Sequence, residues 1–98
     1  MNATGLLVAA VAALASTATA FAAAEPPAGA ASCSGCHPAN AGVETAVPRL
    51  AGRDAAEMVA QMLAFRSGQR PSTVMDRIAK GFSDAEIQAI AAWYAEQR

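Results

Sequence analysis

The stretch Cys33-Ser34-Gly35-Cys36-His37 holds both cysteines and the only histidine of a chain of 98 residues. This C-x-x-C-H spacing is the attachment motif of haem c. Two thiols about one helical turn apart can each add to a vinyl group of the same porphyrin. The histidine that follows can bind the iron from one face of the ring. The motif therefore predicts one covalent haem c, with Cys33 and Cys36 as thioether residues and His37 as an axial iron ligand.

Three other kinds of site use the same residue types. A structural zinc site needs four ligands, usually cysteine and histidine, and the chain has no further residue of either kind. A thioredoxin-like pair would lie in a βαβ unit, for which the sequence gives no signal. A structural disulfide needs no histidine beside it. We therefore favour haem over zinc, dithiol chemistry and a disulfide.

The first 24 residues carry no charged side chain and include an apolar run over residues 6–15. That run suits the h-region of a secretory signal, and Ala22-Ala23-Ala24 offers an A-x-A cleavage pattern. An uncleaved membrane anchor is the alternative, because the uncharged segment is just long enough to span a bilayer. We expect residues 1–24 to be a cleaved signal peptide and residues 25–98 to be one exported, periplasmic domain.

A domain of that size rarely buries enough apolar surface to be stable without additional support, and a covalent haem would supply an apolar centre. The net charge of −1 and the absence of a run of like charges give no sign of nucleic-acid binding. Cationic side chains gather between residues 49 and 80. They form either an ordinary solvated surface, which we favour, or a steering patch for a partner.

Helix signals follow the motif, and no run of residues alternates convincingly with the period of a strand. A helix is expected to begin near Ala30 and to carry the haem motif. Asp54 and Glu57 have the form of a capping box for an amphipathic helix that ends before Gly68. The expected class is therefore all-α, with short helices packed around the haem.

Two further helices are expected near the C-terminus. Thr73 is the expected N-cap of a short helix over residues 74–80, which Gly81 would end. Ser83 and Glu86 form a second capping-box pattern. The helix that follows has an apolar stripe at helical spacing, made of Ile87, Ile90, Ala91 and Tyr94, with Trp93 at its edge.

Haem iron has a second axial position, which methionine commonly fills in electron carriers. Apart from Met1, the candidates are Met58, Met62 and Met75. Met58 and Met62 are four residues apart on the expected amphipathic helix, where core packing is the stronger interpretation. Met75 follows a turn-rich loop that can return the chain to the opposite face of the haem. We therefore predict that Met75 is the second axial ligand.

From Cys33 to its end, the chain resembles the class I c-type cytochromes, and among them the small periplasmic cytochromes of the c553, c4 and c5 kind. Pro48-Arg49-Leu50-Ala51-Gly52 is similar to the P-x-L-A-G element of that group. The resemblance implies that the Pro48 carbonyl accepts a hydrogen bond from Nδ1–H of the axial His37. Such a bond fixes the tautomer of a ligating imidazole.

Residues 65–68 and 72–83 look like the haem domain of the cytochrome subunit of flavocytochrome c sulfide dehydrogenase. In that family, the methionine that matches Met75 is an axial ligand. Two features depart from the pattern: Pro38 stands where glycine commonly follows C-x-x-C-H, and the next loop is short. Some members carry two haem domains, so a single one fits either a monohaem subunit or an independent carrier.

The resemblance implies electron transfer through the haem. A partner flavoprotein would oxidise sulfide at its FAD, and its electrons would pass singly to this chain and on to another cytochrome. A free-standing, soluble c553-like carrier is the alternative. An enzyme or gas sensor with an open iron position is disfavoured, because Met75 would fill that position and the sole histidine is already committed. We therefore expect an electron-transfer protein, not an enzyme, in which the cofactor carries the redox chemistry.

Overall fold

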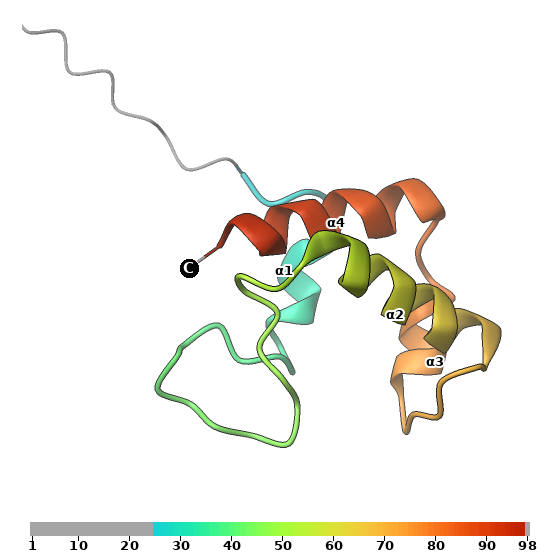
Figure 1. Cartoon of the computed structure of the whole chain (residues 1–98). Coiled ribbons are helices and arrows are strands. Elements are labelled where there is room, and N and C mark those ends of the chain that lie inside the picture. Colours follow the sequence, from blue (N-terminus) through green and yellow to red (C-terminus); the bar gives the residue numbers. More distant parts are fainter. Residues whose placement is uncertain (1–24, 98) are drawn as a thin grey trace, which may run out of the picture.

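The computed structural model describes residues 25–97 (Figure 1). This span contains four helices and no strand: α1 (Ala30–Cys33), α2 (Ala55–Ser67), α3 (Met75–Ala79) and α4 (Asp84–Glu96). The expected all-α class is confirmed. The expected signal peptide, residues 1–24, lies outside the described residues. Within residues 25–97, no helix has the length and apolarity needed to cross a membrane.

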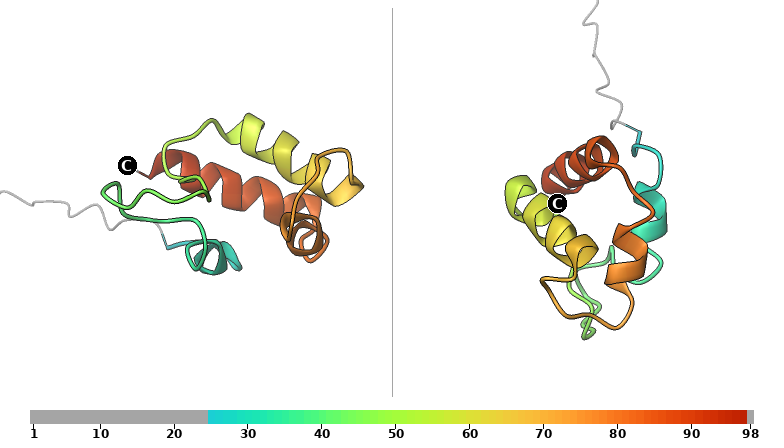
Figure 2. Two further views of the ribbon diagram at one scale, coloured as in Figure 1. Left: turned by 90° about the horizontal axis from the view of Figure 1, so that it is seen from below. Right: turned by 90° about the vertical axis from the view of Figure 1, so that its right-hand side faces the viewer.

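The two long helices, α2 and α4, pack against each other, and α3 packs on α2. Figure 2 shows α4 between α2 on one side and α1 on the other. The segment between α1 and α2 forms no helix and extends from the helices as a wide loop (Figure 1). Both ends of this wide loop are therefore positioned by helices, α1 at its start and α2 at its end.

Helix α2 begins and ends where the sequence predicts. The Asp54 carboxylate accepts a hydrogen bond from the Glu57 backbone N–H at 2.8 Å, and Gly68 ends the helix with a left-handed φ of 81°. The other half of the expected capping box is absent, because the Glu57 carboxylate lies 3.4 Å from the Arg53 guanidinium and accepts from Gln61 at 2.9 Å. The Glu57 side chain is therefore engaged by Arg53 and Gln61, one helical turn to either side, and not by the N-cap backbone.

Helix α4 has the complete capping box. The Ser83 hydroxyl accepts from the Glu86 N–H at 3.2 Å, and the Glu86 carboxylate accepts from the Ser83 N–H at 3.0 Å. The predicted stripe faces the core: Ile87, Ala91 and Tyr94 are 2%, 4% and 8% exposed. Ile90 and Trp93 are partly buried and pack against the core cluster that contains Ala91 and Tyr94.

Helix α3 corrects one expectation. Its N-cap is Val74, and no side chain caps it at that position. The Ser72 hydroxyl, and not that of Thr73, accepts a hydrogen bond from the Asp76 backbone N–H at 2.9 Å. A hydroxyl three residues before the helix therefore accepts from its first turn, and the sequence pattern assigned that contact to the neighbouring Thr73.

The core is small and joins segments that are distant in sequence. Ala30, Met58, Ala91 and Tyr94 form its buried cluster. The Tyr94 hydroxyl donates a buried hydrogen bond of 2.6 Å to the Ala30 carbonyl. This bond attaches α1, which ends at the first cysteine of the haem motif, to α4 near the C-terminus.

The turn before α1 also contacts the start of α4. Gly29, the N-cap of α1, has a left-handed φ of 86°, and a Cβ atom built on it would lie 2.6 Å from Cε1 of Phe82. Arg66, at the end of α2, donates to the Phe82 carbonyl at 3.2 Å and pairs with the Asp84 carboxylate. Residues 82–84 are thus held by both α2 and the turn before α1.

Candidate haem site

The haem motif continues the helical path of α1 for one further turn. The backbone N–H of Cys36 donates to the Cys33 carbonyl at 3.2 Å, and the N–H of His37 donates to the same carbonyl at 2.9 Å. The two cysteines and the histidine therefore follow one another around a single turn. This is the local geometry that attachment of both thiols to one porphyrin requires.

Both thiols are free. Burial raises the pKa of the Cys33 thiol above its usual value, which opposes formation of the thiolate. A catalytic dithiol needs a lowered pKa, because the thiolate is the nucleophile. The local environment of Cys33 therefore does not support the dithiol alternative.

The structure brings His37 and Pro48 together across the wide loop. Nδ1 of His37 lies 2.6 Å from the Pro48 carbonyl oxygen. A carbonyl oxygen can only accept, so Nδ1 carries a hydrogen, and the neutral ring then has its lone pair on Nε2. This is the tautomer that a ligand to iron needs, with its other nitrogen held by a carbonyl.

The position of Pro48 is fixed by contacts on its C-terminal side. The Gly52 backbone N–H donates to the Tyr94 carbonyl at 3.0 Å, with φ of 74° at Gly52. Leu50 is partly buried against the core cluster. The segment over residues 48–52 is therefore attached to the end of α4 and carries the acceptor for the His37 ring.

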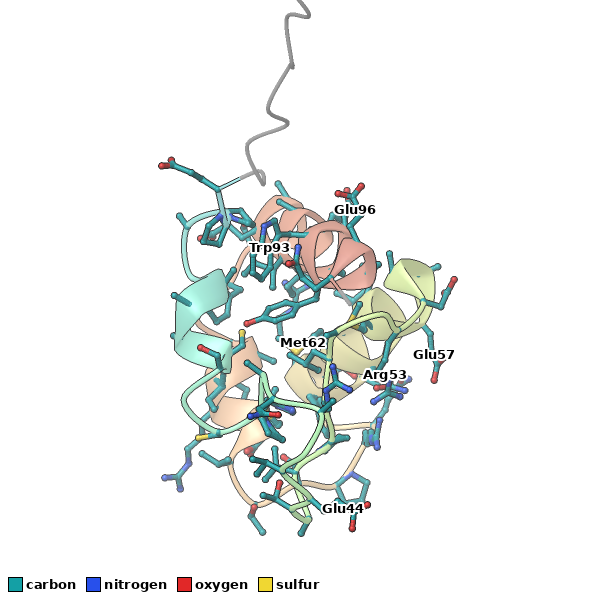
Figure 3. All side chains as sticks on the ribbon, turned by 90° about the vertical axis from the view of Figure 1, so that its left-hand side faces the viewer. Glu44, Arg53, Glu57, Met62, Trp93 and Glu96 are labelled. Atoms are coloured by element: carbon teal, nitrogen blue, oxygen red, sulfur yellow. The ribbon has the colours of Figure 1, made fainter. Side chains whose placement is uncertain are left out.

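Burial distinguishes the methionines. Met58 is 6% exposed and belongs to the buried cluster, as expected for a packing residue. Met62 is half-buried, and Figure 3 shows its side chain directed toward the middle of the molecule. Met75 is the first residue of α3 and is also half-buried. Its role as axial ligand stays a prediction.

The residues near these positions fit a haem. Among the described residues, the large apolar side chains that remain exposed are Val43, Val47, Val74 and Ile78, at 46%, 37%, 49% and 37%. Val47 adjoins Pro48, and Val74 and Ile78 lie on either side of Met75 in sequence. His37 also borders a cleft of about 290 Å³ lined mainly by apolar residues, among them Leu50 and Trp93, although neither cysteine nor Met75 lines it. A large apolar ring suits surroundings of this kind.

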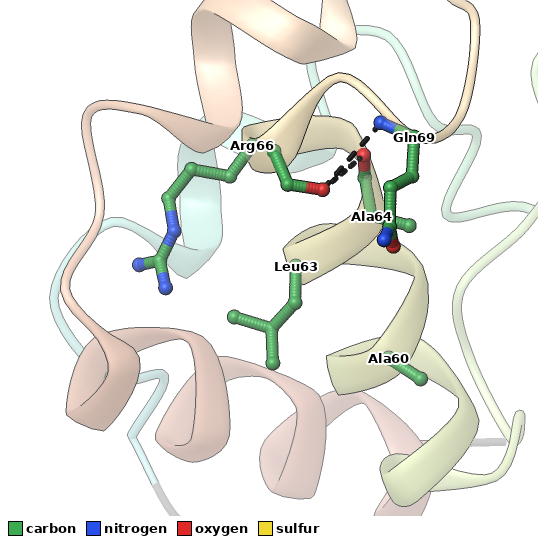
Figure 4. Close-up of a pocket in the computed structure, with 6 residues that line it drawn as sticks. Ala60, Leu63, Ala64, Arg66 and Gln69 are labelled. Atoms are coloured by element: carbon green, nitrogen blue, oxygen red, sulfur yellow. Dashed lines mark hydrogen bonds between the residues drawn. The ribbon is translucent and has the colours of Figure 1, made fainter.

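A second hollow lies on the C-terminal half of α2 and the turn after it (Figure 4). It is lined by Ala60, Leu63, Ala64, Arg66, Ser67 and Gln69. None of these is a candidate ligand, and most are small or polar. This hollow is therefore not the candidate haem site.

Two features near the site were not expected from the sequence. One is the hydrogen bond from Tyr94 to α1, which holds the start of the haem motif. The other concerns Arg49, whose Nε atom is buried without a hydrogen-bond partner. The Arg49 position lies inside the P-x-L-A-G element, but that pattern does not specify the residue type there.

Known proteins that are similar to the chain are cytochromes and electron acceptors. A thiosulfate dehydrogenase electron acceptor of Stutzerimonas stutzeri is 43% identical over 64% of this chain and 31% of its own length. A cytochrome subunit of sulfide dehydrogenase of Chlorobaculum tepidum is 35% identical over 64% of this chain and 57% of its own length. The chain thus spans only part of these two relatives. No protein-family model matches it.

A third relative is of similar size. Cytochrome c-554(548) of Halomonas halodenitrificans is 35% identical over 66% of this chain and 83% of its own length. Together with the all-α fold, this likeness shows that the chain belongs to the class I c-type cytochromes.

Proposed function

We propose that this cytochrome holds one covalent haem c through Cys33 and Cys36, with His37 and Met75 as axial ligands. The observation that carries the proposal is the 2.6 Å contact between Nδ1 of His37 and the Pro48 carbonyl. It leaves Nε2 of the only histidine free to bind iron, directly after two free thiols.

The bound haem supplies a one-electron couple between ferric and ferrous iron. The chain's own residues set the conditions for that couple. The Pro48 carbonyl orients the imidazole and increases its basicity as a ligand. The thioether of Met75 favours the ferrous state and so raises the reduction potential. The apolar residues around the site reduce access of water, which lowers the local dielectric constant.

The electron donor we propose is a sulfide-oxidising FAD flavoprotein, met in the periplasm after export of this chain. The support is the likeness to the Chlorobaculum tepidum protein that is named a cytochrome subunit of sulfide dehydrogenase. A free-standing carrier is the second candidate, favoured by the high coverage of cytochrome c-554(548). Relatives named thiosulfate dehydrogenase electron acceptors agree with a donor from sulfur oxidation in either case.

The covalent haem is tested on protein matured in a host that exports and attaches haem c. Haem-linked peroxidase staining on a denaturing gel should survive acid–acetone extraction in the natural protein. Cys33→Ala combined with Cys36→Ala should abolish that staining, because no thioether can form. Haem that is extracted from the natural protein by acid–acetone would contradict the proposal.

The partner is tested by native purification followed by an absorption scan. A flavin band that accompanies the haem band through size-exclusion chromatography would support the flavoprotein subunit. A haem protein that elutes alone, and is reduced by added donors without a bound flavin, would instead support the free-standing carrier.

A further inference from the structure

Arg49 is a half-buried cation with an unsatisfied donor. Its Nε atom is buried and has no hydrogen-bond partner. Two ion pairs occur among the described residues, Arg53 with Glu57 and Arg66 with Asp84, and neither includes Arg49. A buried guanidinium N–H without an acceptor is unfavourable, because desolvation is not compensated. The structure therefore leaves this side chain in need of an anionic or carbonyl oxygen.

The position of Arg49 relates it to the haem site. It directly follows Pro48, so its Cα lies about 3.8 Å from that of the residue whose carbonyl holds His37. The segment is also fixed on its other side, where the Gly52 N–H donates to the Tyr94 carbonyl. Arg49 thus belongs to a short stretch attached at both ends, directly beside the residue whose carbonyl holds the His37 ring.

A haem brings two propionate groups to such a site, each with a carboxylate that accepts hydrogen bonds. Arginine is well suited to a carboxylate, since its planar guanidinium donates two parallel hydrogen bonds and stays charged at all relevant pH values. We propose that Arg49 binds a haem propionate through its guanidinium, with Nε–H as one of the donors. This inference rests on the proposed haem site and adds a second anchor for the same cofactor.

The bond would also influence the redox couple. Ferric haem carries one more positive charge than ferrous haem. A cation held at the edge of the ring therefore favours the ferrous state and raises the reduction potential, and a site of low dielectric constant strengthens the effect. Arg49 would then act as a positioning residue for the cofactor and as a determinant of its potential.

The test uses the haem-loaded protein and three single variants: Arg49→Gln, Arg49→Lys and the control Arg53→Gln. The control removes the same charge four residues further along, from a side chain that already pairs with Glu57. Resonance Raman spectra report the propionate bending band, and spectroelectrochemistry reports the potential. Haem staining on denaturing gels shows whether each variant has received its cofactor.

We expect Arg49→Gln to shift the propionate band and to lower the potential more than Arg53→Gln does. Arg49→Lys should keep most of the potential, because the charge remains, but should shift the band, because the paired hydrogen bonds are lost. An unchanged band, or equal effects of Arg49→Gln and Arg53→Gln on the potential, would overturn the inference. In that event the natural protein would still stain for covalent haem, so the proposed function would stand.

A measurement on the natural protein removes any dependence on maturation of the variants. In the NMR spectrum of ferrous protein, the Nε–H of Arg49 should be protected from exchange and should show a nuclear Overhauser effect to a propionate methylene group. A rapidly exchanging Nε–H with no such effect would refute the contact directly.

Discussion

The contact between the turn before α1 and Phe82 predicts that Gly29→Ala is strongly destabilising. Gly29 has φ of 86°, and alanine in that left-handed region is disfavoured by roughly 1–2 kcal/mol. The new Cβ would also lie 2.6 Å from Cε1 of Phe82, well inside the ~3.5–4.0 Å optimum for carbon atoms. The ring must move within a packed contact, which costs about 1–3 kcal/mol. We therefore expect Gly29→Ala to lower the free energy of unfolding by about 2–5 kcal/mol.

Gly68→Ala is the matched control. Its φ of 81° is nearly the same, but nothing lies within 4 Å of a Cβ built at that position. Both changes stiffen the unfolded chain alike, so this contribution cancels in the comparison. We expect Gly68→Ala to lower the free energy of unfolding only by the cost of the left-handed backbone, about 1–2 kcal/mol.

The assay is denaturant unfolding of the haem-loaded protein, followed by far-UV circular dichroism. In a thermal melt, each kcal/mol should lower the midpoint by roughly 4–8 °C for a domain of this size. The double variant Gly29→Ala, Phe82→Leu should recover part of the loss, because the ring edge is absent. Equal destabilisation by Gly29→Ala and Gly68→Ala would refute the packing argument and leave backbone strain as the whole effect.

Three other predictions test the core, a cap and the ligand. Tyr94→Phe removes the hydroxyl that donates to the Ala30 carbonyl and should lower the free energy of unfolding by about 0.5–1.5 kcal/mol in a urea titration; no change would show that water replaces the hydroxyl. The backbone N–H at the N-cap of α4, with the cap hydroxyl, lowers the pKa of Glu86 below its usual 4.5. The ionised Glu86 carboxylate therefore contributes to the free energy of unfolding at neutral pH, and this contribution is lost as pH falls through the lowered pKa. The difference in stability between the natural protein and Glu86→Gln should vanish in acid, and a difference independent of pH would contradict the capping role. Met75→Ala should abolish the weak sulfur-to-iron band at the red end of the ferric spectrum and lower the potential, whereas the same result from Met62→Ala alone would identify the other methionine as the ligand.

Features that depend on near neighbours along the chain could be predicted from the sequence. The C-x-x-C-H spacing places two thiols and an imidazole on one turn because that arrangement needs only local helical geometry. Ser83 and Glu86 form their capping box, and Ile87, Ala91 and Tyr94 face the core, because hydrogen bonds and periodicity over a few residues decide both. The all-α class follows from the same local patterns.

Tertiary structure decided the features in which distant residues compete or meet. The Tyr94 hydroxyl meets the Ala30 carbonyl, which lies 64 residues earlier in the chain. Two contacts between near neighbours also escaped the pattern, since Glu57 pairs with Arg53 and Ser72, not Thr73, reaches α3. The contact of Gly29 with Phe82 depends on how the turn before α1 crosses the start of α4, which no local pattern encodes. The buried, unpartnered Nε of Arg49 likewise exists only because the folded loop removes it from water, and burial is a property of the whole fold.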